Sequence, residues 1–150
     1  KFPYYPVHRI SPRRVARLCA LHTGIYRRTG GWIGHRLMGT PTLLLHARGA
    51  KTGTLRSSAL GYWRDGEAYL IAAGNGGADR HPAWFHNLRA NPAAEVNVGR
   101  RRFRVHARTL PPDDAGYARL WDIVTAKNTN YDEYRAATTR PIPLVVLTPA

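Results

Sequence analysis

From Thr42 onward the apolar residues fall in short segments separated by turn-forming residues, and the helical spacing seen earlier in the chain is lost. Apolar runs of about four to eight residues bounded by Gly, Pro, Asn or Asp are typical of β-strands. Because six such segments are more than a single hairpin needs, we expect a mainly β (α+β) domain: a small antiparallel barrel or a strongly curled sheet of about six strands. The expected strands span residues 42–47, 55–64, 67–73, 95–98, 102–108 and 144–148.

Turn and helix signals lie between these strands. Arg64-Asp65-Gly66-Glu67 predicts a tight hairpin turn. Pro82 suits the first turn of a short helix that ends before Pro92. A second helix is expected to start at Asp113 or Asp114, and a third spans residues 131–138. The sequence therefore predicts a barrel with short inserted helices.

The first 40 residues follow a different pattern. Ser11-Pro12 predicts a helix start, and apolar residues at three- and four-residue steps with arginines beside them indicate a basic amphipathic helix over residues 11–28. Its apolar face would either pack on the domain or contact an anionic membrane surface. We therefore divide the chain into a basic amphipathic N-terminal helical segment, residues 1–40, and a barrel domain, residues 41–150.

Positive charge is concentrated in the first half of the chain. Residues 1–64 hold 12 Lys and Arg and no acidic residue, whereas residues 65–150 hold 11 basic and nine acidic residues, for a net charge of +14. This asymmetry predicts an anionic partner: nucleic acid, an anionic membrane or a polyanionic small molecule. The run Arg100–Arg104 encloses Phe103, but its cations are expected to protect a turn and a strand edge, so we expect no nucleic-acid partner.

Several other classes of protein are disfavoured. Cys19 is the single cysteine, so no internal disulfide can form, and a reducing, cytoplasmic setting fits best. No apolar run approaches the roughly 20 residues that cross a bilayer as a helix. The seven histidines show no metal-ligand spacing and no Gly-x-Ser-x-Gly motif is present, so we expect neither a metal site nor hydrolase chemistry.

Two loops carry the clearest chemical signals. In Gly49–Arg56, glycine amides can converge on an anion while Lys51 and Arg56 bond phosphate oxygens, although a solvated polar hairpin fits the local sequence equally well. The spacing and flanking strands do not match a nucleotide P-loop. Gly74–Ala78, before the helix at Pro82, would let backbone approach a planar ligand, or would be only a wide turn.

Both loops and their order resemble the deazaflavin-dependent nitroreductases and quinone reductases of actinobacteria. The match continues through Pro82–Leu88, Ala90-Asn91-Pro92, Tyr131 and Tyr134, and Arg140 before Ile142–Val146. The resemblance implies a split β-barrel that binds coenzyme F420. It also implies hydride transfer from the reduced cofactor to a small-molecule acceptor, a quinone or a nitroaromatic compound.

The resemblance also implies roles for individual residues. Lys51, Arg56 and the amides of Thr52 and Gly53 would hold the cofactor phosphate, and Arg48 could add charge. The deazaflavin ring would lie against the strand after Arg56 and the glycine-rich loop. The residues expected to surround the ring are Ser58, Ala59, Gly74, Asn75, Gly76, Gly77, Ala78, Trp84 and Asn87.

Tyr131 and Tyr134 are the expected catalytic residues of the acceptor site. They lie three residues apart on one helical face, so both could stack on a flat acceptor or donate a hydroxyl to it. Asn128 stands where some nitroreductase members carry a further tyrosine, which disfavours nitroimidazole reduction.

Three further expectations stay open. Flavin mononucleotide (FMN) is the alternative cofactor, since FMN-binding split-barrel oxidoreductases share the architecture, and a non-catalytic F420 binder would use the same basic loop. Related split barrels often dimerise, so a homodimer is compatible with this chain. Residues 11–28 would place a cytoplasmic protein at the inner face of the membrane.

Overall fold

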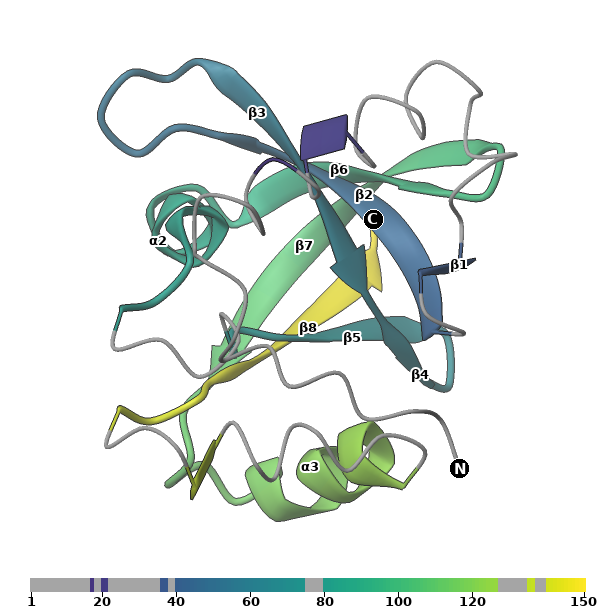
Figure 1. The fold of residues 1–150 in the computed structure, drawn as a ribbon, viewed down its shortest axis with the longest axis vertical. Helices are drawn as coiled ribbons and strands as arrows, with labels where there is room; N and C mark the ends of the chain where they lie inside the picture. Colours follow the sequence, from purple (N-terminus) through teal and green to yellow (C-terminus); the bar gives the residue numbers. More distant parts are fainter. Residues whose placement is uncertain are drawn as a thin grey trace.

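The computed structural model describes residues 17, 20–21, 36–37, 40–74, 80–126, 135–136 and 140–150. The expected helices at 11–28 and 131–138 lie mostly outside these ranges, although the described residues 17, 20, 21, 135 and 136 are helical. The elements are shown in Figure 1. They are β1 (Arg36–Leu37), β2 (Thr40–Arg48), β3 (Leu55–Gly61), β4 (Trp63–Asp65), β5 (Ala68–Ala72), α2 (Ala83–Ala90), β6 (Ala93–Val98), β7 (Arg101–Leu110), α3 (Tyr117–Thr125) and β8 (Leu144–Pro149).

The strands form an antiparallel barrel that closes through the chain itself. The sheet runs in the order β1-β2-β6-β7-β8-β5-β4, and β3 pairs with β2. Past Tyr62, β3 continues into β4, which pairs with β5 at the other end of this order. If β3 and β4 count as one bent strand, six segments surround the interior, so the expected mainly β split barrel is confirmed.

One expected strand needs a correction. We expected residues 55–64 to form a single strand, but this segment changes partner at Tyr62, whose amide donates to the carbonyl of Pro41 at 3.0 Å. The expected hairpin turn between β4 and β5 is confirmed, since Gly66 has φ +60°, a left-handed conformation that glycine adopts without strain.

Alternate residues of the strands fill the barrel interior. The register places Leu43 and Leu45 of β2 across from Leu60 and Ser58 of β3, on the inner side. Helix α2 contributes three side chains to the same buried cluster, so it closes part of the interior. This cluster contains Leu43, Leu45, Ala47, Tyr69, Ile71, Ala73, Trp84, Phe85, Leu88, Ala94, Val96, Val105, Ala107, Val145 and Leu147.

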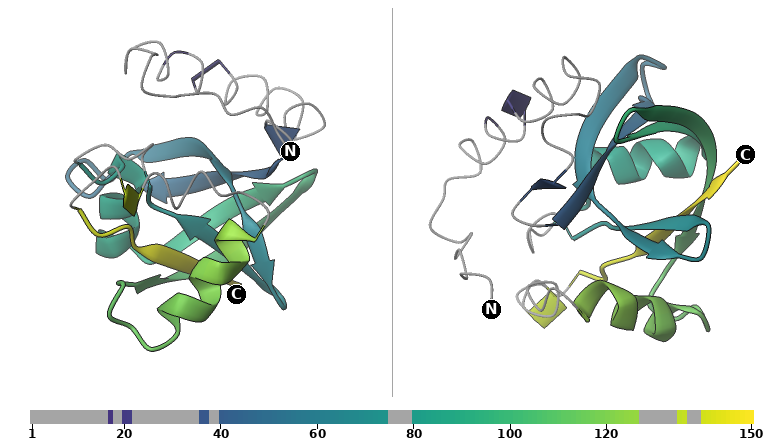
Figure 2. Two further views of the ribbon diagram at one scale, coloured as in Figure 1. Left: turned by 60° about the horizontal axis from the view of Figure 1, so that its bottom comes forward. Right: turned by 90° about the vertical axis from the view of Figure 1, so that its right-hand side faces the viewer.

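Helix α3 covers the outer face of the barrel at β4, β5 and β8. Figure 2 shows α3 beside the β5–β8 side of the barrel. Successive side chains of a strand point to opposite faces. The continuous apolar runs of β5 and β8 therefore contribute side chains both to the barrel interior and to the contact with α3. The second buried cluster consists of Trp63, Leu70, Leu110, Tyr117, Leu120, Trp121, Val124, Ile142, Leu144 and Val146.

The arginine-rich run Arg100–Arg104 begins in the turn between β6 and β7 and continues along the first residues of β7. Within the described residues, this part of β7 pairs with β6 alone, because β8 pairs with β7 only from Val105 onward, so the expectation that these cations lie at a turn and a strand edge is confirmed. Phe103 packs against the barrel cluster, whereas Arg102 and Arg104 are exposed on the other face. The sheet therefore separates the aromatic ring from these two cations, whereas the Arg101 guanidinium lies over the Phe103 ring, 5.3 Å from its centroid.

Candidate functional site

The loop between β2 and β3, residues 48–56, which we term the cationic loop, folds tightly on itself. The Gly53 amide donates to the Gly49 carbonyl at 2.9 Å, and the Gly49 amide donates to the Thr54 carbonyl at 2.8 Å. Gly53 has φ +67°, and a Cβ on Gly49 would lie 2.7 Å from the Thr52 hydroxyl. The backbone conformation therefore favours glycine at Gly53, a side chain at Gly49 would displace the Thr52 hydroxyl, and the Gly53 amide expected to bind phosphate is engaged within the loop.

Three cations project from this loop. Arg48, Lys51 and Arg56 are all exposed. The Arg48 guanidinium donates to the Gly53 carbonyl at 3.2 Å, so Arg48 supports the loop as well as adding charge. Within the described part of the chain, no ion pair engages Lys51 or Arg56. This arrangement suits an anion, because charged donors already stand at the surface of an internally bonded loop.

Helix α2 is in contact with the cationic loop. The side-chain oxygen of Asn87 accepts a hydrogen bond from the Ala50 amide at 2.9 Å. Asn87 was expected to bind the cofactor, and in the structure its oxygen fixes the loop that carries Lys51. Trp84 is buried with the barrel cluster and makes an edge-on contact with Phe85, with ring centroids 6.3 Å apart. Figure 1 shows the β2–β3 hairpin above α2.

Ser58 and Ala59 point to opposite faces of β3. Ser58 is paired with Leu45, which faces the barrel interior, whereas Ala59 is paired with Leu44 on the other side. A planar ring lying against β3 would therefore contact one of these two side chains together with the strand backbone.

The expected ring and acceptor sites are described only in part. Gly74 is buried at the end of β5. Its expected neighbours Asn75, Gly76, Gly77 and Ala78 lie outside the described residues, as do Tyr131, Tyr134 and Asn128. Beyond this segment, the His81 ring packs on Phe85 of α2 at 4.7 Å between ring centroids. Helix α2 therefore contacts both the cationic loop, through Asn87, and the chain that follows the glycine-rich loop.

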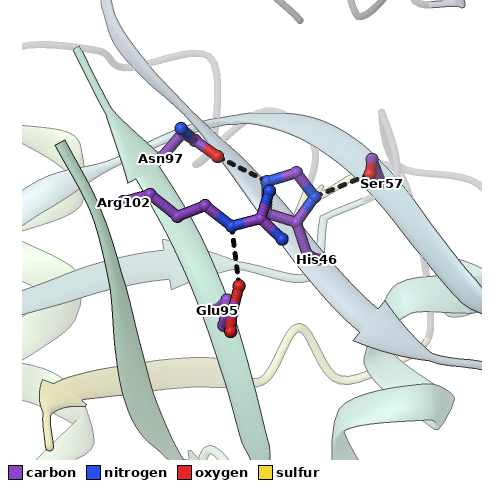
Figure 3. Close-up of polar contacts among 5 residues, drawn as sticks. All are labelled: His46, Ser57, Glu95, Asn97 and Arg102. Carbon is purple, nitrogen blue, oxygen red and sulfur yellow. Dashed lines mark hydrogen bonds and ion pairs between the residues drawn. The ribbon is translucent and has the colours of Figure 1, made fainter. Parts of the chain in front are cut away.

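A polar network around the buried His46 lies on the outer face of β2, as shown in Figure 3, and no local sequence pattern predicts it. His46 is only 4% exposed; its Nδ1 lies 2.7 Å from the Ser57 hydroxyl and its Nε2 lies 2.6 Å from the Asn97 side-chain oxygen. Since that oxygen only accepts, Nε2 carries the hydrogen and a neutral ring accepts from Ser57. Beside it, Arg102 and Glu95 form an ion pair at 2.7 Å. The histidine links β3, β2 and β6.

The described residues form an antiparallel split barrel that presents a cationic loop next to α2, an arrangement suited to a protein that binds an anionic cofactor. The family model described as F420H(2)-dependent quinone reductase matches residues 18–149. The chain belongs to this family.

Relatives agree with this assignment. An F420H(2)-dependent quinone reductase of Mycobacterium tuberculosis is 55% identical over 134 residues, which cover 88% of this chain and 90% of that protein. A solved F420-H2 dependent reductase is 30% identical, with TM-score 0.64, and the match covers 71% of this chain and 93% of that one. A second solved structure, described as a domain-swapped dimer, is 28% identical, with TM-score 0.67, and the match covers 91% of this chain and 99% of that one.

Two further features of the structure bear on other functions. Among the described residues, no three His, Cys, Asp or Glu side chains form a group that could hold a metal ion. In the same part of the chain, no helix combines the length and apolar character needed to cross a bilayer.

Proposed function

We propose that this protein binds reduced coenzyme F420 and uses it to reduce a quinone. The observation that carries the proposal is the exposed pair Lys51 and Arg56 on an internally hydrogen-bonded loop. The family and the named activity of the mycobacterial relative support F420 as the cofactor and a quinone as the acceptor. Nitroaromatic compounds are a second proposed acceptor class, because they are also flat and electron-poor.

The described residues fit the anionic part of such a cofactor. Lys51 and Arg56 would bind phosphate oxygens, and Arg48 adds a third positive charge while bonding the Gly53 carbonyl. Asn87 keeps the loop in place through the Ala50 amide. Because these contacts exist within the chain itself, the loop loses little conformational freedom when it binds an anion.

Hydride transfer from the cofactor does not require a pair of acid and base side chains on the protein. When bound, reduced F420 supplies the hydride, and a quinone that accepts a hydride also takes up a proton to become a hydroquinone. The chain must hold two planar molecules in contact, exclude water and stabilise negative charge on the acceptor oxygen. We propose that Tyr131 and Tyr134 stack on the acceptor and donate to that oxygen.

Assembly and location are also proposed. We propose a homodimer, which is supported by the structural relative described as a domain-swapped dimer. The basic segment at residues 11–28 is proposed to contact an anionic membrane surface from the cytoplasmic side, where a lipid-soluble quinone would be available.

Anaerobic turnover tests the proposed activity. Reduced F420 is mixed with menadione and the protein, and the return of the visible absorbance of oxidised F420 is followed. We expect turnover that falls in Lys51→Ala and Arg56→Ala and stays unchanged in Arg104→Ala, which removes an exposed charge from β7. Binding without oxidation would indicate a non-catalytic carrier, and flavin released on denaturation would indicate the FMN-dependent class.

A further inference from the structure

Arg140, which precedes β8, contacts both ends of the glycine-rich segment. Its Nη2 donates to the Gly74 carbonyl at 2.9 Å, and its Nη1 donates to the Ala73 carbonyl at 3.1 Å. The same Nη1 lies 2.8 Å from Nδ1 of His81, beyond the segment, and 3.2 Å from the Pro141 carbonyl. One guanidinium therefore joins the residues that leave β5 to the residue that leads into α2.

The segment that follows Arg140 is held in place by hydrogen bonds to its neighbours. The amide of Ala73 donates to the Pro143 carbonyl at 3.0 Å, and the Tyr117 hydroxyl donates to the Ile142 carbonyl at 2.6 Å. Tyr117, Ile142 and Pro143 are all buried, and burial raises the pKa of the Tyr117 phenol to about 12, so the hydroxyl keeps its proton. The chain from 140 to 143 is thus anchored on α3 and β5.

The chemistry of the contact requires arginine and a neutral histidine. An arginine carries five N–H donors in a planar fork, so its two terminal nitrogens can bond separate acceptors. A lysine ammonium places all its donors on one nitrogen and cannot replace both the bond to the Gly74 carbonyl and the contact with the His81 ring. Because Arg140 only donates, Nδ1 of His81 must present a lone pair.

The surroundings of His81 favour that neutral state. Desolvation and the positive charges of Arg140, His86 and Arg89 hold the pKa of His81 below its ordinary value of 6.5. His86 and Arg89 lie on α2, and Arg140 lies on the segment before β8. Within the described residues, the charges that act on His81 are therefore all positive. Those on α2 and on the segment before β8 both disfavour protonation of the ring.

We infer that Arg140 is a positioning residue, which holds Gly74 and His81 in fixed places and so sets the two ends of the segment expected to receive the cofactor ring. This inference rests on the proposed function for its effect on F420 binding. It goes beyond that function because no charge on Arg140 needs to touch the cofactor: the guanidinium acts through the Gly74 carbonyl and the His81 ring.

The test compares Arg140→Gln, Arg140→Lys and Arg108→Gln, the last removing an exposed charge on β7. Amide hydrogen exchange of the full chain, followed in the peptide that contains residues 73–81, is measured without cofactor. We expect at least tenfold faster exchange in this peptide for Arg140→Gln and Arg140→Lys, with α3 and Arg108→Gln unchanged. Unchanged exchange in the Arg140 variants would overturn the inference; accelerated exchange throughout the chain would also overturn it, since Arg140 would then support the whole fold.

F420 titration provides the second readout. We expect both Arg140 variants to bind F420 at least tenfold more weakly than the wild type, because lysine restores the charge but not the fork. Wild-type affinity recovered by Arg140→Lys would overturn the positioning role in favour of a simple charge effect. If the wild type itself fails to bind F420, the proposed function fails, and the exchange experiment alone decides the role of Arg140.

A pH profile separates positioning from general support of the fold. Below the pKa of His81, a proton on Nδ1 removes the acceptor and sets a second positive charge beside Arg140. After correction for the intrinsic pH dependence of amide exchange, we expect faster exchange in the 73–81 peptide of the wild type as the pH falls through the range in which His81 gains a proton. In His81→Gln the amide oxygen accepts at every pH, so this acceleration should disappear. An acid acceleration that persists in His81→Gln would contradict the assignment.

Discussion

Replacement of Asn87 separates two roles for this residue, loop support and direct cofactor contact. In Asn87→Ala the Ala50 amide loses its 2.9 Å acceptor, and a hydrogen bond of this kind contributes about 0.5–1.5 kcal/mol net. Residue 87 lies inside α2, where alanine is the better helix former by up to roughly 0.7 kcal/mol. The two effects nearly offset each other in global stability.

The loss should therefore appear in cofactor binding. If the bound state needs the ordered cationic loop, the same 0.5–1.5 kcal/mol weakens F420 binding by roughly 2- to 12-fold, since 1.4 kcal/mol is a factor of about 10. The midpoint of thermal unfolding should move by less than about 3 °C. Fluorescence titration with F420 and circular dichroism melting measure the two quantities.

Asn87→Asp is the matched variant. Its carboxylate still accepts from the Ala50 amide but adds a negative charge beside a loop that carries Lys51. We expect the melting temperature to be retained and F420 affinity to fall, with the loss decreasing as salt screens the repulsion. F420 affinity equal to the wild type in both variants would refute the argument that Asn87 sets the loop for cofactor binding.

Three further predictions follow from other contacts. Tyr117→Phe removes the donor to the buried Ile142 carbonyl and should cost about 1–3 kcal/mol, seen as a lower urea midpoint; an unchanged midpoint would refute the contact. Lys51→Ala with Arg56→Ala should weaken F420 binding and flatten its salt dependence, whereas an unchanged slope would place the phosphate elsewhere. His46→Phe should destabilise the protein by about 1–3 kcal/mol in thermal melts, because the half-buried Ser57 and Asn97 lose their hydrogen bonds to the ring; a wild-type melting temperature would contradict this.

The strand pattern could be predicted from the sequence because the period of the apolar residues and the Asp65-Gly66 turn are local signals. The break at Tyr62 could not, since residues 55–64 are continuously compatible with extended structure. The change of partner from β2 to β5 depends on how far the whole sheet curls. The arginine run of β7 could be placed correctly because its one partner, β6, directly precedes it in the chain.

Some features of the candidate site could likewise be predicted from the local sequence, and others depend on contacts between distant residues. The cationic loop could be predicted because its glycines and cations are adjacent in the sequence. The contact of Asn87 with Ala50 joins residues 37 positions apart, and that of Arg140 with Ala73 joins residues 67 apart. The pairing of His46 with Asn97 spans 51 residues. Single-sequence patterns carry no information on such contacts, so polar residues that support a site resemble residues that bind a ligand.

The central claim is that this barrel binds F420 through the cationic loop. Titration of the wild-type protein with F420, followed by the cofactor's fluorescence, tests it most directly. The account predicts saturable quenching at micromolar F420 that weakens with rising salt and in Lys51→Ala or Arg56→Ala. A protein that leaves the fluorescence unchanged at these concentrations would contradict the account.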